Sequence, residues 1–414
     1  MKESTKMASV AKSQKSIVLM CCIVYFISYI TRKNYAAIMV EFVNDTGIAI
    51  DSASLALTGH AIFYGAGQLV SGYLGDKIKP KFLIACGLFT TALMNILLPF
   101  CSEVALLTTV WCINGLAQAM MWPPIVKALS STFSSSDDYK KSTVKVSNSA
   151  MIATVLLYLL SPVCITYAGW ETIFYVAGAL AAVMAFVVLF FMPDTADQKE
   201  TAPEKTNDKE ETHMGAGVKF PFVLFGLIMI AIILQGMMRD GVSDWLPTYL
   251  ENEFAISSQV AILLGVAPPI FAMLCFELVS FLSRRVVKNE LFFAGIIFAI
   301  SFVSSCALSF FSSSSIALST ILSTIVTGSM HGVNLILICL LPPYFKKTGR
   351  VSLISGLLNS CTYVGSALSG YGFAVLAKFF GWRGTIIGWA IICGVATVIC
   401  LALVKKWQSF KNQA

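Results

Sequence analysis

The stretch SIVLMCCIVYFISYITRKNYAAIMV, residues 16–40, decides the fold, because Arg32 interrupts an otherwise apolar run. A second run, FPFVLFGLIMIAIILQGMMRDGVSDWLP at residues 220–247, carries Arg239 at the corresponding place. A charged side chain near the bilayer centre costs at least ~2.5 to 3.5 kcal/mol on insertion scales, so each arginine implies a cavity, a partner or an anionic ligand. Because the two positions correspond, they predict one shared anion site.

The composition sets the class of protein, since 57% of the residues are hydrophobic and only 12% are charged, which excludes an ordinary soluble domain. A spanning helix needs about 20 mostly apolar residues, and continuous runs of this kind form helices rather than barrel strands. We expect an all-α membrane protein with twelve transmembrane helices in two six-helix pseudo-symmetric bundles. The expected spans are 16–40, 52–75, 82–100, 104–130, 145–168, 171–192, 220–247, 258–283, 290–311, 316–343, 351–377 and 384–404.

The longest polar stretch separates the two halves of the chain. Residues 193–219 are rich in Asp, Glu, Lys, Thr and Pro and have too little apolar surface to fold alone. We therefore expect an N-terminal bundle at 1–192, a cytoplasmic linker at 193–219 and a C-terminal bundle at 220–414. Every second loop is basic, which by the positive-inside rule puts both termini in the cytoplasm of a plasma (inner) membrane. Proline pairs at 123–124, 268–269 and 342–343 are expected to kink three spans.

Several function classes find no support in the sequence. The twelve cysteines lie almost all in apolar spans without a Cys-x-x-Cys spacing, and the three histidines form no cluster, so we expect no metal site and no disulfide framework. No phosphate-binding loop and no Ser-His-Asp arrangement occurs. We expect no enzyme activity and no cofactor. We attribute the net charge of +7 to the basic loops that orient the protein in the membrane, rather than to a surface that binds nucleic acid.

Scattered motifs resemble a known transporter family. They are Arg32-Lys33-Asn34-Tyr35, Gly72-Tyr73-Leu74-Gly75-Asp76-Lys77, Asn114-Gly115 with Gln118, Trp122, Pro123 and Pro124, and Arg239 with Gly241, Asp244-Trp245 and Pro247-Thr248-Tyr249-Leu250. The loop from Gly72 to Lys77 resembles a signature of the major facilitator superfamily, and the other motifs resemble the organophosphate:phosphate antiporter family within it. The resemblance implies the major facilitator fold, a site between the bundles near the midplane, and a role for Arg32 and Arg239 in binding the phosphoryl group of the substrate.

The residues around Arg32 support such a role independently. Tyr25, Tyr29 and Arg32 are spaced by four and three positions and therefore share a helix face. A guanidinium binds phosphate through two parallel charge-assisted hydrogen bonds, and the phenols would line the cavity. Two alternatives stay open: the tyrosines could belong to an interfacial belt, and buried acids or helix carbonyls could neutralise the arginines.

The other candidates come from helical spacing and from the resemblance. Asp240 and Asp244 share a face, so either could pair with Lys33 across the two halves as a gating ion pair. His60 is expected to be structural, whereas packing remains an alternative for Trp122 and His331. The further substrate-binding candidates are Tyr64, Gln68, Gln118, Trp122, His331 and Tyr363.

We expect a monomeric secondary transporter that exchanges an organic phosphate, such as a sugar phosphate or glycerol phosphate, for inorganic phosphate. Gln68 stands where the family pattern has lysine, and residues 147–149 lack the histidine expected in the glycerol-3-phosphate branch. A proton-coupled transporter of another organic anion therefore stays open. A transporter-like membrane sensor of organophosphates is the second alternative, because the family includes such a receptor.

Overall fold

The computed structural model describes residues 2–133, 136–193, 222–311, 313–341, 344 and 351–413, and this part of the chain contains helices and no strand. The helices are α1 (Lys2–Thr46), α2 (Ile50–Lys77), α3 (Pro80–Leu97), η1 (Leu98–Phe100), α4 (Val104–Gln118), α5 (Trp122–Thr132), α6 (Ser136–Ala168), α7 (Glu171–Phe191), α8 (Phe222–Gly236), η3 (Met237–Gly241), α9 (Val242–Phe254), α10 (Ser258–Leu264), α11 (Ala267–Arg285), α12 (Glu290–Phe311), α13 (Ile316–Asn334), η4 (Leu335–Leu340) and α14 (Val351–Gln413).

Ten of the described segments are long and apolar enough to cross a membrane. One of them, Gly356–Asn412, passes through Gly381, whose φ of 66° and ψ of 179° interrupt the helix. It therefore holds the two spans expected at 351–377 and 384–404. α2 covers the span expected at 52–75 but is not among the ten. The expected fold class is confirmed, although length and composition alone identify ten spans rather than twelve.

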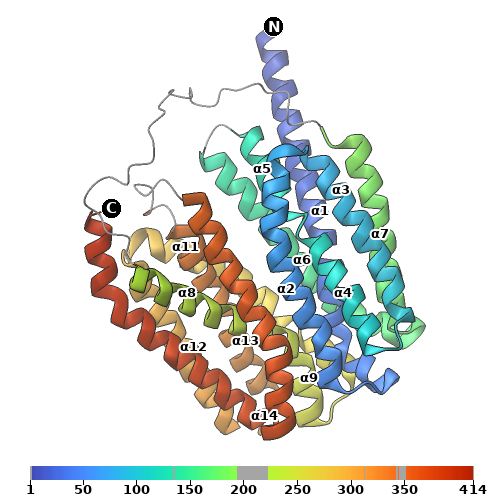
Figure 1. The fold of residues 1–414 in the computed structure, drawn as a ribbon, viewed down its shortest axis with the longest axis vertical. Coiled ribbons are helices and arrows are strands. Elements are labelled where there is room, and N and C mark those ends of the chain that lie inside the picture. The colour runs from blue at the N-terminus through green and yellow to red at the C-terminus, as the bar shows by residue number, and fades with distance from the viewer. Residues whose placement is uncertain are drawn as a thin grey trace.

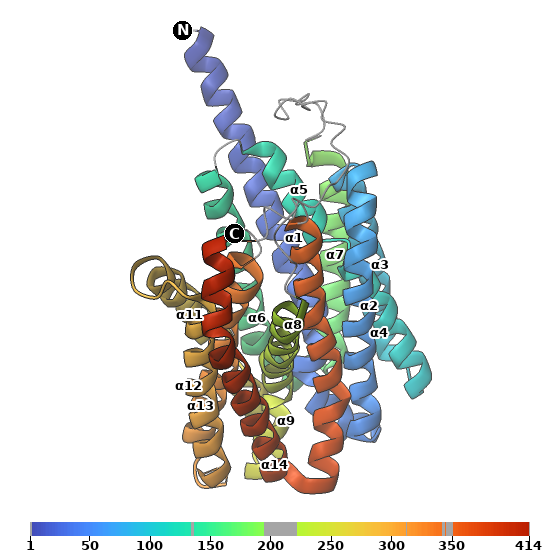
Figure 2. The same cartoon turned by 60° about the vertical axis from the view of Figure 1, so that its left-hand side comes forward.

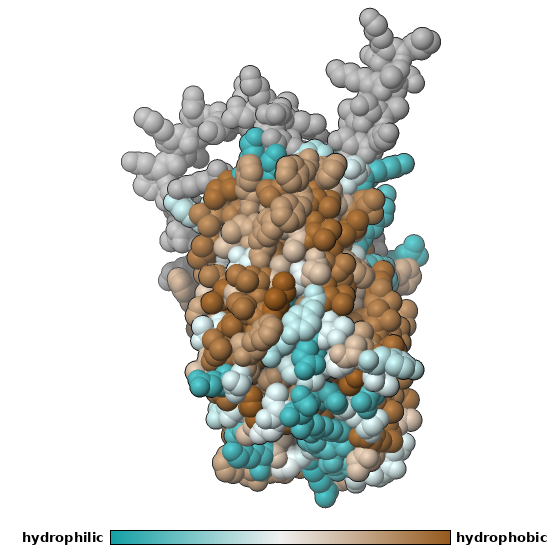
Figure 3. All heavy atoms as spheres, turned by 90° about the vertical axis from the view of Figure 1, so that its right-hand side faces the viewer, coloured by the Kyte–Doolittle hydropathy of each residue, from teal (hydrophilic) through white to brown (hydrophobic). Residues whose placement is uncertain are grey.

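The molecular surface agrees with a lipid environment. Large apolar side chains such as Phe190, Phe222 and Val398 are exposed to 77%, 77% and 67%. In Figure 3, apolar side chains cover most of one face, and hydrophilic side chains gather toward one end. A soluble monomer rarely exposes contiguous apolar area of this extent, so the multi-pass membrane character of the protein follows from the surface as well as from the helices.

Proline interrupts two of the spans as expected. Pro123 and Pro124 stand in the first turn of α5, and α4 ends just before it at Gln118. Pro268 and Pro269 occupy the first turn of α11 after α10 ends at Leu264. Proline fits the first turn of a helix because the amide hydrogen that it lacks has no intrahelical acceptor there. The third pair, 342–343, lies outside the described residues.

The helices form two groups (Figures 1 and 2). α1 to α7 lie on one side and α8 to α14 on the other, with α2 beside α14 where the groups meet. α1 begins and α14 ends toward the same end of the molecule, here called the proximal end, and the segment α14 turns back at the opposite, distal end. The expected linker 193–219 lies outside the described residues from position 194 onward, so the division into three domains stays a prediction.

Polar contacts join the two groups on the distal side of Arg32. Asn44 donates to Glu251 at 2.7 Å, and Lys378 donates to Asp51 at 2.5 Å. Closer to the middle, the hydroxyl of Thr58 donates to the carbonyl of Ala367 at 3.0 Å and accepts from the backbone amide of Tyr371 at 2.8 Å. A further hydrogen bond runs from Ser258 to Glu41. We call this set of contacts the distal seam, because it closes the space between the groups toward the distal end.

Two glycines let α8 and α14 cross at backbone contact. A Cβ atom added to Gly365 would lie 2.0 Å from the carbonyl oxygen of Ile233, and one added to Gly236 would lie 2.1 Å from that of Thr362. Small residues at such crossings allow helix backbones to approach closely in membranes. The crossing fixes the orientation of the segment that follows α8, which carries Arg239.

Gly365→Ala is therefore expected to destabilise the protein by about 1 to 3 kcal/mol, the usual range for overpacking, because a backbone oxygen cannot move aside as a side chain can. Thermal unfolding of the detergent-purified protein should show a lowered Tm. Gly372→Ala is the matched control on the same helix, because its added Cβ meets nothing within 4 Å. Equal Tm values for the two variants would contradict the proposed crossing.

Candidate functional site

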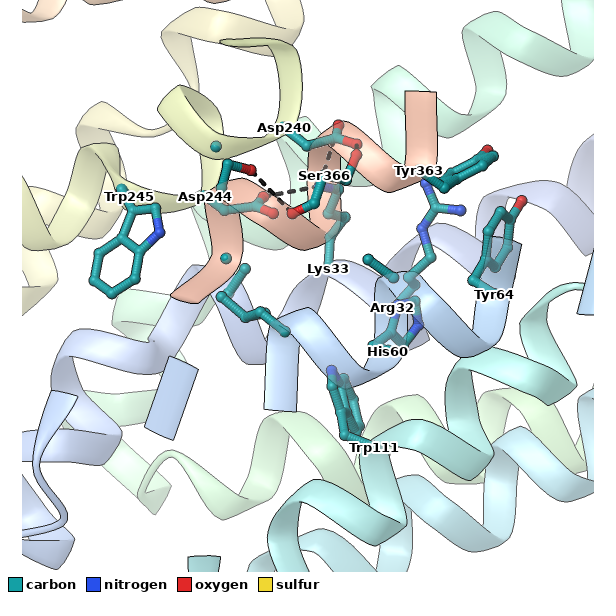
Figure 4. A pocket seen from close by; sticks show the side chains of 16 residues that line it. Arg32, Lys33, His60, Tyr64, Trp111, Asp240, Asp244, Trp245, Tyr363 and Ser366 are labelled. Carbon is teal, nitrogen blue, oxygen red and sulfur yellow. Dashed lines mark hydrogen bonds and ion pairs between the residues drawn. The ribbon is translucent and has the colours of Figure 1, made fainter. Parts of the chain in front are cut away.

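A cavity lies between the two helix groups (Figure 4). Its walls come from α1, α2, α4, η3, α9 and α14. η3 is a π-helical turn, a feature that is frequent at functional sites, and it bears the second arginine of the repeat. The lining residues are Arg32, Lys33, Ala36, Leu57, His60, Ala61, Tyr64, Trp111, Asp240, Gly241, Asp244, Trp245, Tyr363, Ser366, Ser369 and Gly370.

Arg32 is held by aromatic rings rather than by an acid. Its guanidinium carbon lies 4.5 Å from the ring centre of Tyr29 and 4.8 Å from that of Tyr64, both within cation–π range. Among the residues that the structure describes, no carboxylate lies within ion-pair distance of this guanidinium. Aromatic faces leave the hydrogen-bond donors in the guanidinium plane uncommitted, so Arg32 retains the capacity to bind an anion.

Aromatic contacts extend from Arg32 in two directions. Tyr29 contacts Tyr25 with ring centres 5.0 Å apart, and Tyr25 contacts Trp122 at 4.9 Å. On the other side, Tyr64 of α2 contacts Tyr363 of α14 at 4.6 Å, so this pair joins the two helix groups. Tyr29 and Tyr64 thus contact Arg32 directly, whereas Trp122 is connected to it only through Tyr25 and Tyr29. Tyr64 and Tyr363 line the cavity, and Tyr25, Tyr29 and Trp122 do not, so the substrate-binding role of these residues stays a prediction. Their depth beside Arg32 argues against an interfacial belt.

Arg239 is ion-paired with an acid, whereas the sequence predicts that its guanidinium binds the ligand together with Arg32. Its Nε and one terminal nitrogen donate to the two carboxylate oxygens of the adjacent Asp240, at 3.1 and 2.7 Å. Asp240 also accepts a hydrogen bond from Ser366. Arg239 is absent from the cavity lining given above. In this conformation the alternative of neutralisation by a buried acid therefore holds for Arg239 and not for Arg32.

Lys33 pairs across the two helix groups in the predicted geometry. Its ammonium donates to Asp244 at 2.8 Å and lies 3.9 Å from Asp240, and its side chain is only 15% exposed. Asp240 lies in η3 and Asp244 in α9, so both acids belong to the second helix group. The sequence predicts this pairing of Lys33 across the two halves. The role of this ion pair in gating stays a prediction. Counted with Arg32 and Arg239, the three cations and two acids leave one positive charge in excess, which favours an anionic ligand.

Three other candidates lie outside the cavity lining. Gln118 is fully buried, accepts from Ser28 at 2.5 Å and donates to Thr31 at 2.8 Å. Its amide therefore joins α4 to α1 in this conformation, and its expected contact with the substrate stays a prediction. The buried Nε2 of Gln68 has no hydrogen-bond partner among the described residues. His331 also lies outside the cavity lining, and its substrate role stays a prediction.

Sequence reasoning missed several residues that line the cavity. His60, expected to be structural, is one of them, and Trp111, Trp245 and Ser366 are further examples. Ser366 could have been found, because it lies three positions after Tyr363 and so shares its helix face. Nothing in the sequence distinguishes Trp111 from the other buried tryptophans, because its place in the cavity depends on how α4 packs against α2. Among the described residues, no group of three metal-ligating side chains occurs.

Comparisons with known proteins agree with the fold. The sequence profile of the Major Facilitator Superfamily matches residues 21–370. The chain is 25% identical over 419 residues to a "Probable hexose phosphate transport protein" of Chlamydia muridarum, covering 93% of this chain and 89% of that protein. It is 22% identical to "Membrane sensor protein UhpC" of Salmonella typhimurium, covering 92% and 89%.

Among solved structures, a bacterial homologue of the human lysosomal transporter Spinster has the same fold, with a TM-score of 0.79 and 12% identity over 96% of this chain and 98% of that one. The chain belongs to the Major Facilitator Superfamily. Its relatives and structural neighbours are membrane proteins of transport and sensing rather than enzymes. The expected superfamily is confirmed, and the relatives agree with the resemblance to the organophosphate:phosphate antiporter family.

Proposed function

We propose that this protein is a secondary active transporter that exchanges an organic phosphate for inorganic phosphate by alternating access. The observation that carries the proposal is the Arg32 guanidinium, which lines a cavity between the helix groups and has no carboxylate within ion-pair distance among the described residues. An intramembrane cation without an acid is costly unless a ligand supplies the counter-charge. Phosphate matches the planar donor fork of arginine.

The charges of the site favour exchange over one-way movement. An empty site carries one excess cation, counted from Arg32, Lys33, Arg239, Asp240 and Asp244. Moving that uncompensated charge through the closed state is unfavourable, whereas an anion in the site offsets it. Return of the empty carrier is therefore slow, and phosphate on either side accelerates reorientation. This is the behaviour of an exchanger.

We further propose that the proximal end faces the cytoplasm of a plasma membrane, because the basic loops belong to that end by the positive-inside rule. The distal seam then closes the site toward the outside, and the structure corresponds to a conformation open toward the cytoplasm.

Reconstituted proteoliposomes test the exchange. Vesicles loaded with inorganic phosphate are expected to accumulate labelled glucose 6-phosphate or glycerol 3-phosphate, and vesicles without internal phosphate are not. Collapsing the proton gradient with an ionophore should leave the exchange unchanged. Uptake that needs a proton gradient and ignores internal phosphate would instead support a proton-coupled transporter.

A membrane sensor is the second candidate, because the chain also matches a protein of that name along most of its length. The same vesicles separate the two functions. Saturable binding of an organic phosphate to the purified protein, combined with no exchange in either direction, would favour the sensor. Binding accompanied by exchange favours the transporter.

A further inference from the structure

A network of fully buried polar side chains flanks Arg32 in the first helix group. Asn34 of α1 donates to Asn95 of α3 at 2.7 Å, and Asn114 of α4 donates to the backbone carbonyl of Thr31 at 3.2 Å. These four polar residues are all 0% exposed. Polar side chains in the interior of a membrane-spanning bundle are costly unless they are hydrogen-bonded, so these bonds determine which groups of the three helices meet.

Asn95 holds α1 on both sides of Arg32. Its amide donates to the carbonyl of Thr31 at 3.2 Å, and its side-chain oxygen accepts from Asn34. The carbonyl of Thr31 thus accepts from two side-chain amides, those of Asn95 and Asn114. Within the first helix group α1 packs mainly against α6 and α7, so these bonds tie it to α3 and α4 as well. They fix the rotation of α1 about its axis, and therefore the direction of the Arg32 side chain.

The second helix group holds its arginine in a similar way. The hydroxyl of Thr327 on α13 donates to the backbone carbonyl of Arg239 at 2.6 Å. Arg239 lies in the π-helical turn η3, where the backbone departs from regular α-helical bonding. α4 lies in the fourth of the expected spans and α13 in the tenth, which is the fourth of the second half. The backbone anchor therefore repeats together with the arginine.

We propose that Asn95, Asn114 and Thr327 are positioning residues that hold the two arginine-bearing backbone segments for anion binding. This inference rests on the proposed function. Arg32 contacts aromatic rings instead of an acid, so its direction depends on the backbone that carries it. A bidentate contact with phosphate requires a guanidinium that is held within narrow limits. None of the three positioning residues lines the cavity, so each acts through the backbone rather than on the ligand.

Asn114→Leu tests the anchor on α1, because leucine has the same branched shape but no donor. The buried Oδ1 of Asn114 has no hydrogen-bond partner among the described residues, so losing this unpaired acceptor offsets the lost bond to Thr31. Binding of inorganic phosphate to the purified protein is expected to weaken about five- to tenfold. The Tm should stay within about 2 °C of wild type. Asn95 is less suitable for this test, because it also bonds to Asn34 and Thr91.

Thr327→Val tests the anchor on α13, because valine keeps the shape of threonine and lacks the hydroxyl. Exchange in proteoliposomes is expected to fall about three- to fivefold, whereas Thr327→Ser keeps the donor and should keep nearly the wild-type rate. Thr320→Val is the matched control on the same helix. Thr320 is 6% exposed and donates to the carbonyl of Ile316 within its own helix, so its replacement should leave exchange unchanged.

Separate results overturn the two proposals. Wild-type phosphate affinity in Asn114→Leu, or weaker binding together with a Tm lowered by more than about 5 °C, would assign Asn114 to folding alone. Equal exchange rates in Thr327→Val and Thr327→Ser would refute the anchor on α13. A wild-type protein that binds phosphate without exchanging it contradicts the proposed function, and phosphate binding by Asn114→Leu then still decides on positioning. A wild-type protein that binds no phosphate contradicts both proposals.

Discussion

Arg32→Lys is expected to lower the exchange of organic phosphate for inorganic phosphate by about 100-fold, the effect of losing one or two hydrogen bonds to a charged group. Lysine keeps the charge but lacks the planar fork that donates two parallel bonds to a phosphate. Its ammonium would also lose the contacts that the Arg32 guanidinium makes with the rings of Tyr29 and Tyr64. The initial rate of labelled substrate uptake into phosphate-loaded vesicles measures the effect.

Two arginines serve as comparisons for Arg32→Lys. Arg383 is exposed on α14, so Arg383→Lys should keep the wild-type rate. Arg239→Lys should cost only about tenfold, because the Arg239 guanidinium is already bound to Asp240 and a lysine can keep part of that ion pair. Equal uptake rates for the Arg32→Lys and Arg383→Lys variants would contradict an anion-binding role for Arg32.

Asp244→Asn is expected to separate binding from transport. The substitution leaves Lys33 without its 2.8 Å partner and raises the excess positive charge of the site by one. Binding of inorganic phosphate should therefore tighten several-fold, since a second unpaired cation near the anion strengthens the attraction. Exchange should fall by about tenfold or more, because the variant loses the ion pair that joins the two helix groups and leaves a buried charge uncompensated.

The matched experiment for Asp244→Asn removes both charges at once. In Lys33→Met combined with Asp244→Leu, no buried charge is left alone, so the Tm of the double variant should exceed that of either single variant. Its affinity for phosphate should return toward wild type. Additive losses of Tm in the double variant would contradict an energetic link between Lys33 and Asp244. A loss of phosphate binding in Asp244→Asn would contradict the charge argument.

The sequence predicts the architecture well because the bilayer imposes a simple rule on it. Apolar runs of about 20 residues define the spans, and prolines at 123–124 and 268–269 stand where two spans are interrupted. α2 shows the limit of this rule. Thr58 and Tyr64 contact α14 and His60 contacts α4, so polar side chains of α2 are covered by protein on more than one side. Its composition is therefore too polar for a span judged by hydropathy alone.

The site could be predicted only as far as helix faces and charge pairing determine it. The spacing of Tyr25, Tyr29 and Arg32 fixes one face of one helix, and the structure agrees. Whether an arginine meets a carboxylate depends on local backbone geometry. The π-helical turn at 237–241 allows Arg239 to reach its own neighbour Asp240, and periodicity in the sequence does not reveal such a turn.

The sequence also does not predict which side chains of one helix contact another helix and which reach the cavity. Gln118 satisfies the hydrogen-bonding capacity of Ser28 and Thr31 on α1, whereas Trp111 on the same helix reaches the cavity. Both residues are compatible with either role by type and by position. Which of them faces the substrate depends on how α4 packs against α1 and α2.

An experimental structure with a heavy phosphate analogue tests the central claim most directly. Arsenate has the shape and charge of phosphate, and its anomalous scattering locates the ion without ambiguity. We expect an arsenic peak within hydrogen-bonding reach of the Arg32 guanidinium, on the same cavity that Tyr64 and Tyr363 line, and no such peak in crystals of Arg32→Lys. A peak bound elsewhere in the protein, with Arg32 making no contact to it, would contradict the account.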